Sequence, residues 1–181
     1  VCALTGAGVT LVAPAGRVRY DIDLIVPAAY DEVLAATTMA DFDGRPGGRA
    51  AADCRGTDLG GSGIVDDQIA LPEAGFARSD ADRRHLVAAP GVCLAATGAV
   101  ADQLPRLTTG APAVAAVAAG VTALCIAGRK CPAADPATTV RTIVGDATRH
   151  HLRHPEYGYY GDPRHPVRGR YYGPLLTAGL Y

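Results

Sequence analysis

The stretch that most constrains the fold is residues 107–128, which contain no charged side chain. It is rich in alanine and valine, with Pro112 near its start and Gly128 at its end. Proline suits the first turn of a helix because its φ is fixed and it lacks an N–H, whereas glycine commonly follows the last turn. The stretch therefore predicts one buried helix. A membrane-spanning helix is the less favoured interpretation, because the stretch is also rich in glycine and only approaches the required length of about 20 residues.

Short apolar or β-branched runs on either side of polar loops predict an α/β domain. Strands are expected at residues 9–12, 33–38 and 84–88, the end of a helix at 1–8, and a further helix at 135–148 with Asp135 as its N-cap. Residues 41–67 are rich in Gly, Asp and Arg and predict a polar surface loop. Residues 157–181 hold six of the eight tyrosines and predict an irregular or hairpin tail that covers a core.

Length, charge and cysteine content narrow the class of protein. The 181 residues, 49% of them hydrophobic, fit one domain, and the net charge of −1 argues against a strongly electrostatic nucleic-acid partner. Five cysteines favour an oxidising, secreted setting, with Cys125 and Cys131 as a candidate disulfide. Because the chain begins at Val1, we expect it to be processed or to be part of a longer protein.

Two groups of polar side chains resemble metal sites but have simpler structural interpretations. Pro155 interrupts the segment that holds a group of possible metal ligands, so we interpret them as solvated side chains at a helix end: His150, His151, His154, Glu156 and His165. Asp41 and Asp43 could contribute to a calcium loop, but a turn with exposed carboxylates is favoured. We expect no metal and no cofactor.

The order of several segments resembles the C-terminal half of the subtilisin-like serine peptidases. The segments that carry the resemblance are residues 13–16 (Ala-Pro-Ala-Gly), 26–33 (Val-Pro-Ala-Ala-Tyr-Asp-Glu-Val), 39–44 (Met-Ala-Asp-Phe-Asp-Gly), 87–92 (Val-Ala-Ala-Pro-Gly-Val), 110–120, 160–163 and 169–174. The resemblance implies a parallel sheet flanked by helices, a Ser-His-Asp triad that hydrolyses peptide bonds, and secretion.

Matched to this family, the catalytic positions are altered. Pro112 stands at the nucleophile position and Arg17 at the position of the oxyanion asparagine, while the segment expected to supply the Asp and His is absent. The only serines are Ser62 and Ser79, and neither lies in the motif. The resemblance also implies that one wall of the substrate site is formed by Ala13, Pro14, Ala15 and Gly16.

We therefore expect an inactive fragment of a secreted peptidase, or a pseudopeptidase, with a peptide or protein substrate as its ancestral partner. The missing N-terminal half is a second candidate partner, whereas nucleic acid and membrane are not expected. The alternatives are a non-catalytic peptide- or protein-binding module and an unrelated α/β domain whose likeness to the family is accidental.

Overall fold

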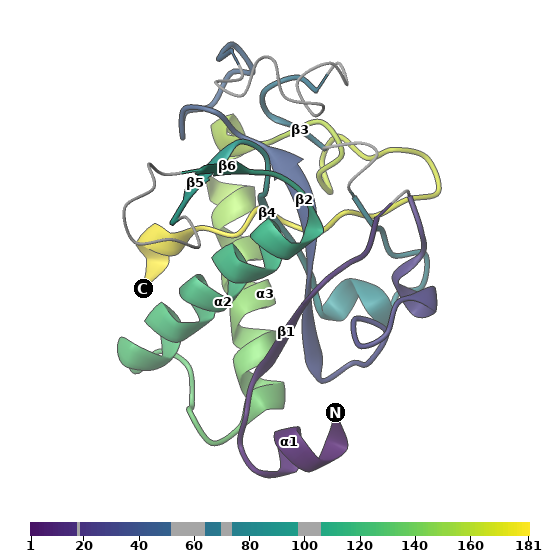
Figure 1. The fold of residues 1–181 in the computed structure, drawn as a ribbon, viewed down its shortest axis with the longest axis vertical. Coiled ribbons are helices and arrows are strands. Elements are labelled where there is room, and N and C mark those ends of the chain that lie inside the picture. The colour runs from purple at the N-terminus through teal and green to yellow at the C-terminus, as the bar shows by residue number, and fades with distance from the viewer. Residues whose placement is uncertain (18, 52–63, 70–73, 98–105) are drawn as a thin grey trace.

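The fold is taken from a computed structural model, which describes residues 1–17, 19–51, 64–69, 74–97 and 106–181 (Figure 1). A mixed sheet is covered on one face by two helices, so the α/β class predicted from the sequence is confirmed. The strands are β1 (Leu11–Pro14), β2 (Val33–Ala40), β3 (Gln68–Ile69), β4 (Leu86–Pro90), β5 (Leu94–Ala96) and β6 (Arg106–Thr108). The helices are α1 (Cys2–Gly6), α2 (Ala111–Ala127) and α3 (Pro136–Arg153), with four short 3-10 turns: η1 (Ile22–Leu24), η2 (Asp82–Arg84), η3 (Pro155–Tyr157) and η4 (Ala178–Leu180).

Strand β2 lies at the centre of the sheet, and all eight of its residues are buried. It pairs in parallel with β1 and with β4, and its end pairs antiparallel with β3. Successive side chains of a strand point to opposite faces. Leu34 and Ala36 accordingly pack with α2 and α3, whereas Val33 and Ala35 belong to a second core on the other face.

The C-terminal tail covers one edge of the sheet. The Ala88 N–H donates to the Pro174 carbonyl at 2.9 Å, and the Leu176 N–H donates to the Ala88 carbonyl at 2.8 Å. Tyr159 and Tyr172 of this tail are buried, which matches the tyrosine-rich covering segment expected at residues 157–181. On the opposite edge, no described residue forms a strand beside the outer side of β1.

Helix α2 is where the prediction for residues 107–128 needs correction. Residues 106–108 form β6, and the helix begins only at Ala111, with Pro112 in its first turn. One side of the helix is buried, but Leu124 is 49% exposed, so the helix is not buried all round. A helix on one face of a sheet buries only the stripe that meets the sheet, and an apolar sequence does not reveal which stripe that is. Among the described residues, no helix combines the length and apolarity that a membrane crossing requires.

Other boundaries moved by a few residues. Strand β1 begins at Leu11 instead of residue 9, β2 extends to Ala40, and α3 continues to Arg153. The N-cap assigned to Asp135 is confirmed, because its carboxylate accepts from the Thr138 N–H at 2.9 Å. The polar loop at 41–67 has no helix or strand in its described parts, and residues 52–63 of it lie outside the described part of the chain.

The predicted disulfide between Cys125 and Cys131 is present and ties the end of α2 to the segment that leads to α3. The two cysteines are six residues apart, and closing so short a loop restricts the unfolded chain by about 2 kcal/mol. We therefore expect the Cys125→Ala/Cys131→Ala variant to lose about 2 kcal/mol in urea unfolding. A variant as stable as the wild type would show that the crosslink does not constrain the unfolded chain.

Candidate functional site

In open α/β sheets, ligands usually bind where the carboxyl ends of the parallel strands meet. At this edge, Gly110 precedes α2 with φ +113°, and its N–H donates to the Gly91 carbonyl at 2.7 Å. A Cβ on Gly91 would lie 2.7 Å from Thr38 Cγ2. The start of α2 is thus held tightly against the ends of β2 and β4.

The residues that the resemblance assigned to catalysis lie near this edge without forming a catalytic group. Pro112 is exposed in the first turn of α2, and Arg17 is exposed beyond the end of β1. Ala13 and Ala15 are buried in the core, at 2% and 0% exposure. Pro14 and Gly16 are half-buried, so the substrate-wall assignment of residues 13–16 stays a prediction.

A nucleophile of hydrolysis needs a base within hydrogen-bonding reach. In the described part of the chain, every hydroxyl hydrogen bond runs to a backbone group, a carboxylate or an arginine, and none runs to an imidazole. Ser79, for example, donates to Asp82. Ser62 lies outside the described residues. The described residues therefore show no paired hydroxyl nucleophile and histidine base.

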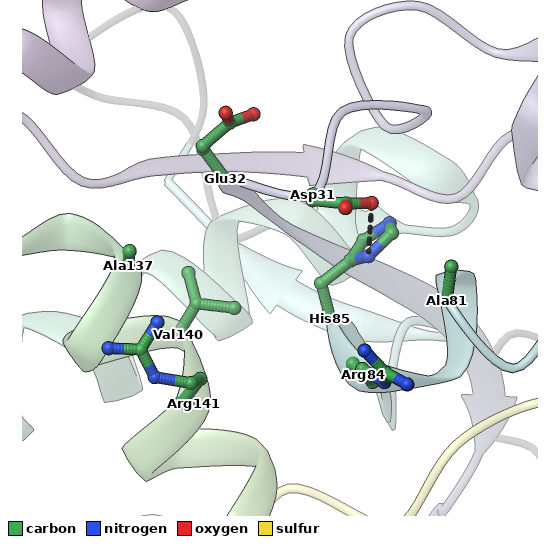
Figure 2. A pocket seen from close by; sticks show the side chains of 8 residues that line it. All are labelled: Asp31, Glu32, Ala81, Arg84, His85, Ala137, Val140 and Arg141. Carbon is green, nitrogen blue, oxygen red and sulfur yellow. Dashed lines mark ion pairs between the residues drawn. The ribbon is translucent and has the colours of Figure 1, made fainter.

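The opposite, amino-terminal edge of the sheet holds a cluster that the sequence did not single out. Asp31 and Glu32 directly precede β2, and His85 directly precedes β4, the parallel neighbour of β2. Figure 2 shows Asp31 facing the His85 ring, with Nδ1 and the Asp31 carboxylate 3.8 Å apart. Together with α3 these residues line a cavity of about 230 Å³.

The His85 ring is 1% exposed and has two different environments. Its Nε2 lies 3.1 Å from the Ala28 carbonyl, and because a carbonyl oxygen only accepts, Nε2 carries the proton. Its Nδ1 is buried without a hydrogen-bond partner. Close by, the pKa of Asp23 is raised, chiefly by the negative charge of Asp82 and secondly by burial. Several carboxylates therefore lie close together here. Asp31 precedes the strand predicted at 33–38, but His85 fell inside the strand predicted at 84–88, and the sequence did not show that the two side chains meet.

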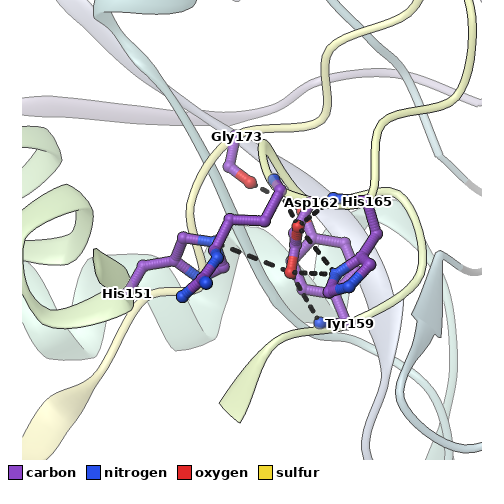
Figure 3. Close-up of polar contacts among 6 residues, drawn as sticks. His151, Tyr159, Asp162, His165 and Gly173 are labelled. Carbon is purple, nitrogen blue, oxygen red and sulfur yellow. Dashed lines mark hydrogen bonds and ion pairs between the residues drawn. The ribbon is translucent and has the colours of Figure 1, made fainter. Parts of the chain in front are cut away.

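A second cluster surrounds Asp162, whose side chain is fully buried in the tail (Figure 3). Its carboxylate accepts from the backbone N–H groups of Tyr159 at 2.9 Å, Arg164 at 2.6 Å and His165 at 2.7 Å. His151 reaches it from α3 with Nε2 at 3.6 Å. The bonds to backbone N–H groups indicate that Asp162 chiefly holds the turn together.

The histidines of this region differ in exposure, which corrects their common interpretation as solvated groups. His151 is only 3% exposed, because the tail folds over the inner face of α3. His154 is 45% exposed and pairs with Glu156 at 3.1 Å, so the solvated interpretation holds for it. Asp41 and Asp43 lie near Asp66 but accept from or contact backbone N–H groups of their own loop, as expected of a polar turn.

Burial lowers the pKa of His151 below its usual 6.5, opposed in part by Asp162. The unfolded chain then binds the proton more readily than the folded chain. The free energy of unfolding is therefore unaffected by this group above about pH 6.5 and decreases as the pH drops below that value. For one group the slope is at most about 1.4 kcal/mol per pH unit. We expect His151→Gln to flatten this slope in guanidinium unfolding at pH 7.5, 6.5 and 5.5, while Leu152→Gln on the exposed side of α3 keeps it. An unchanged slope in His151→Gln would refute the assignment.

Comparison with known proteins gives a fold but no family. No family model matches the chain, and no curated protein matches it. Its fold is similar to the structure of the prenylagaramide maturation protease PagA, with a TM-score of 0.55 and 18% sequence identity. The likeness covers 94% of this chain and 48% of PagA, so the chain spans about half the length of that protein.

These findings correct the family and the function inferred from the sequence. They show a fold similar to that of the maturation protease, but support neither the subtilisin-like family nor a secreted subtilisin-like endopeptidase, and at 18% identity the likeness shows the fold alone. No observation favours the non-catalytic binding module instead. Three of the segments behind the resemblance, residues 13–16, 39–44 and 87–92, run over the ends of strands, where turn residues such as Pro, Gly and Asp are common in any α/β protein. The roles given to Pro112 and Arg17 lose their basis together with the family.

Proposed function

We propose that this chain forms one half of a protease-like hydrolase domain that acts on a peptide chain, and that a second half completes the domain across β1 and α2. The observation that carries the proposal is the unequal coverage: the fold likeness takes in 94% of this chain but only 48% of the maturation protease. The other half of such a fold has to be supplied by further polypeptide, either covalently joined or separate.

The open edge of β1 supports this proposal. Among the described residues, β1 pairs only with β2 on its inner side, whereas the tail covers the far edge of the sheet at β4. An uncovered edge strand presents unpaired N–H and C=O groups that a further strand can pair with. The sheet is therefore ready for extension on the β1 side.

The exposed side of α2 supports it as well. The helix has no charged residue along its whole length, and Leu124 is 49% exposed. Helices that face only water normally carry polar residues on the outer side. Val12 of β1 packs against the same core as Val117 of α2, so the open edge and the apolar helix belong to neighbouring elements. One docked segment can cover both.

Catalysis by the completed domain draws on that second half. The described residues offer no hydroxyl hydrogen-bonded to an imidazole, so we assign no nucleophile to them. This chain supplies the sheet and the tightly held start of α2, and the second half supplies the reacting pair. We further propose that the domain forms in an oxidising, extracytoplasmic compartment, for which the Cys125–Cys131 disulfide is the support.

Peptide hydrolysis tests the proposal. Residues 1–181 alone and the tagged native assembly isolated from the source cells are incubated with a quenched peptide library, and cut sites are read by mass spectrometry. We expect cleavage by the native assembly and none above buffer by the isolated chain. Cleavage by the isolated chain, or no cleavage by the assembly, contradicts the proposal.

A pair of matched variants ties the activity to the proposed surface. Leu124→Lys places a charge on the exposed side of α2, and Leu152→Lys places one on the exposed side of α3, where Leu152 is 64% exposed. Both should fold, because both side chains already face solvent. We expect Leu124→Lys to reduce assembly and cleavage at least tenfold and Leu152→Lys to leave both unchanged. Equal behaviour of the two variants would refute docking across α2.

A further inference from the structure

From the geometry at the amino-terminal edge of the sheet, we propose that Asp31, Asp82 and His85 bind a divalent transition-metal ion of the Zn²⁺ class. This site goes beyond the proposed function and lies at the other end of the strands from the start of α2. Imidazole nitrogen and carboxylate oxygen are ligand atoms that Zn²⁺ accepts, and three protein ligands leave a further position for water.

The three side chains converge from separate segments. Their ligand atoms all lie within 4.8 Å of one another. Asp31 comes from the turn before β2, Asp82 from η2, and His85 from the residue before β4. With metal bonds of about 2.0–2.1 Å, tetrahedral ligands are separated by about 3.3 Å, so ligand atoms that now lie up to 4.8 Å apart have to approach by as much as about 1.5 Å. Asp31 can move toward the two buried ligands, because its side chain is 75% exposed.

The unpartnered nitrogen of His85 is the independent observation that points to a ligand. Nε2 donates to the Ala28 carbonyl, which leaves the lone pair of a neutral ring on Nδ1. Metal-binding histidines have this arrangement, in which the distal N–H is fixed by a carbonyl or carboxylate. Here Nδ1 is buried without a hydrogen bond and faces the Asp31 carboxylate across 3.8 Å. Two acceptors face each other, and a cation between them satisfies both.

The surroundings favour a cation and leave it accessible. Ser79 donates to Asp82 and fixes the orientation of that carboxylate, while Glu32 adds a further negative charge at the cavity. Arg84 and Arg141 also line the cavity and oppose a cation, but Arg141 donates to Thr138 at 2.6 Å along its own helix. The cavity of about 230 Å³ has room for the water that completes the coordination.

Titration with Zn²⁺ tests the site, with matched aspartate variants. Isothermal titration should give one Zn²⁺ per chain, and Asp31→Asn should weaken binding at least about tenfold. Asp80→Asn serves as the control, because Asp80 is 86% exposed and pairs only with the neighbouring Arg83. His154→Gln should also leave the affinity unchanged, which separates the site from the exposed histidines. Binding that Asp31→Asn leaves intact, or that His154→Gln abolishes, contradicts the proposal.

Nitrogen NMR of the wild-type protein gives a test that needs no variant. Zn²⁺ should shift the Nδ1 resonance of His85, while Nε2 keeps its proton and its bond to the Ala28 carbonyl. A Nδ1 resonance that Zn²⁺ leaves unchanged would overturn the metal site.

Discussion

Gly75→Ala should destabilise the protein by about 3 kcal/mol or more, or prevent folding altogether. A Cβ on Gly75 would lie 1.8 Å from the Ala15 carbonyl oxygen and 2.6 Å from its carbon. These are backbone atoms, so no side-chain rotation relieves the clash. The Ala15 N–H in turn donates to the Ala36 carbonyl at 2.8 Å, and the Thr37 hydroxyl donates to the Gly75 carbonyl at 2.6 Å. If the backbones of Gly75 and Ala15 moved apart to relieve the clash, the hydrogen bonds at the junction of β1 and β2 would be disturbed.

Guanidinium unfolding measures this effect, with soluble yield as the readout where the variant fails to fold. Gly120→Ala is the matched control, since a Cβ there meets nothing within 4 Å. Gly120 lies inside α2 on its exposed side, so alanine should raise stability by about 0.5–1 kcal/mol. If Gly75→Ala unfolds within 0.5 kcal/mol of the wild type, the close packing of residues 74–77 on β1 is wrong.

Asp162→Ala should cost about 3 kcal/mol or more. The change removes a fully buried carboxylate that accepts from three backbone N–H groups, and two of these groups, those of Tyr159 and Arg164, have no other acceptor among the described residues. The Tyr159 N–H is buried, and a buried donor that loses its acceptor costs the full free energy of its lost hydration. The turn also holds Tyr159 in place, whose hydroxyl donates to the Gly173 carbonyl at 2.7 Å.

Two further variants test whether the loss of stability comes from the Asp162 carboxylate. Asp162→Asn keeps one acceptor oxygen and should lose less stability than Asp162→Ala. Asp80→Ala removes an exposed carboxylate and should stay within about 0.5 kcal/mol of the wild type. A similar loss in Asp162→Ala and Asp80→Ala, measured by thermal and guanidinium unfolding, would show that the turn does not depend on Asp162.

Local signals in the sequence predicted the elements, but not how they are partnered. Pro112 and Gly128 marked the two ends of α2 closely, because proline and glycine act on the backbone of their own turn. Which side of α2 is buried depends on the sheet, and an apolar stretch without polar residues carries no information on that point. The exposed side became visible only in the structure.

The two buried histidines illustrate the same limit. His151 lies four residues from a proline and beside other histidines, so its neighbours in sequence indicated a solvated helix end. Its burial comes from the tail around Asp162, eleven residues further on. Asp31 lay just before one predicted strand and His85 inside another, yet only the parallel pairing of β2 with β4 brings them together.

The family assignment failed for a related reason. Short segments of Ala, Pro and Gly follow strands in many α/β proteins, so their order reports the alternation of strands and helices. That alternation was enough to predict the fold class. It did not predict the catalytic function, because a catalytic site depends on side chains that come together from distant segments of the chain.

Hydrogen–deuterium exchange tests most directly whether this chain is half of a larger domain. Exchange is compared between residues 1–181 alone and the tagged native assembly, in peptides from β1, α2 and α3. We expect amides of β1 and of α2 to exchange at least tenfold more slowly in the assembly, and those of α3 to exchange equally in both. Equal exchange in β1 and α2 would contradict the account, because no second half would then cover the surface on which it rests.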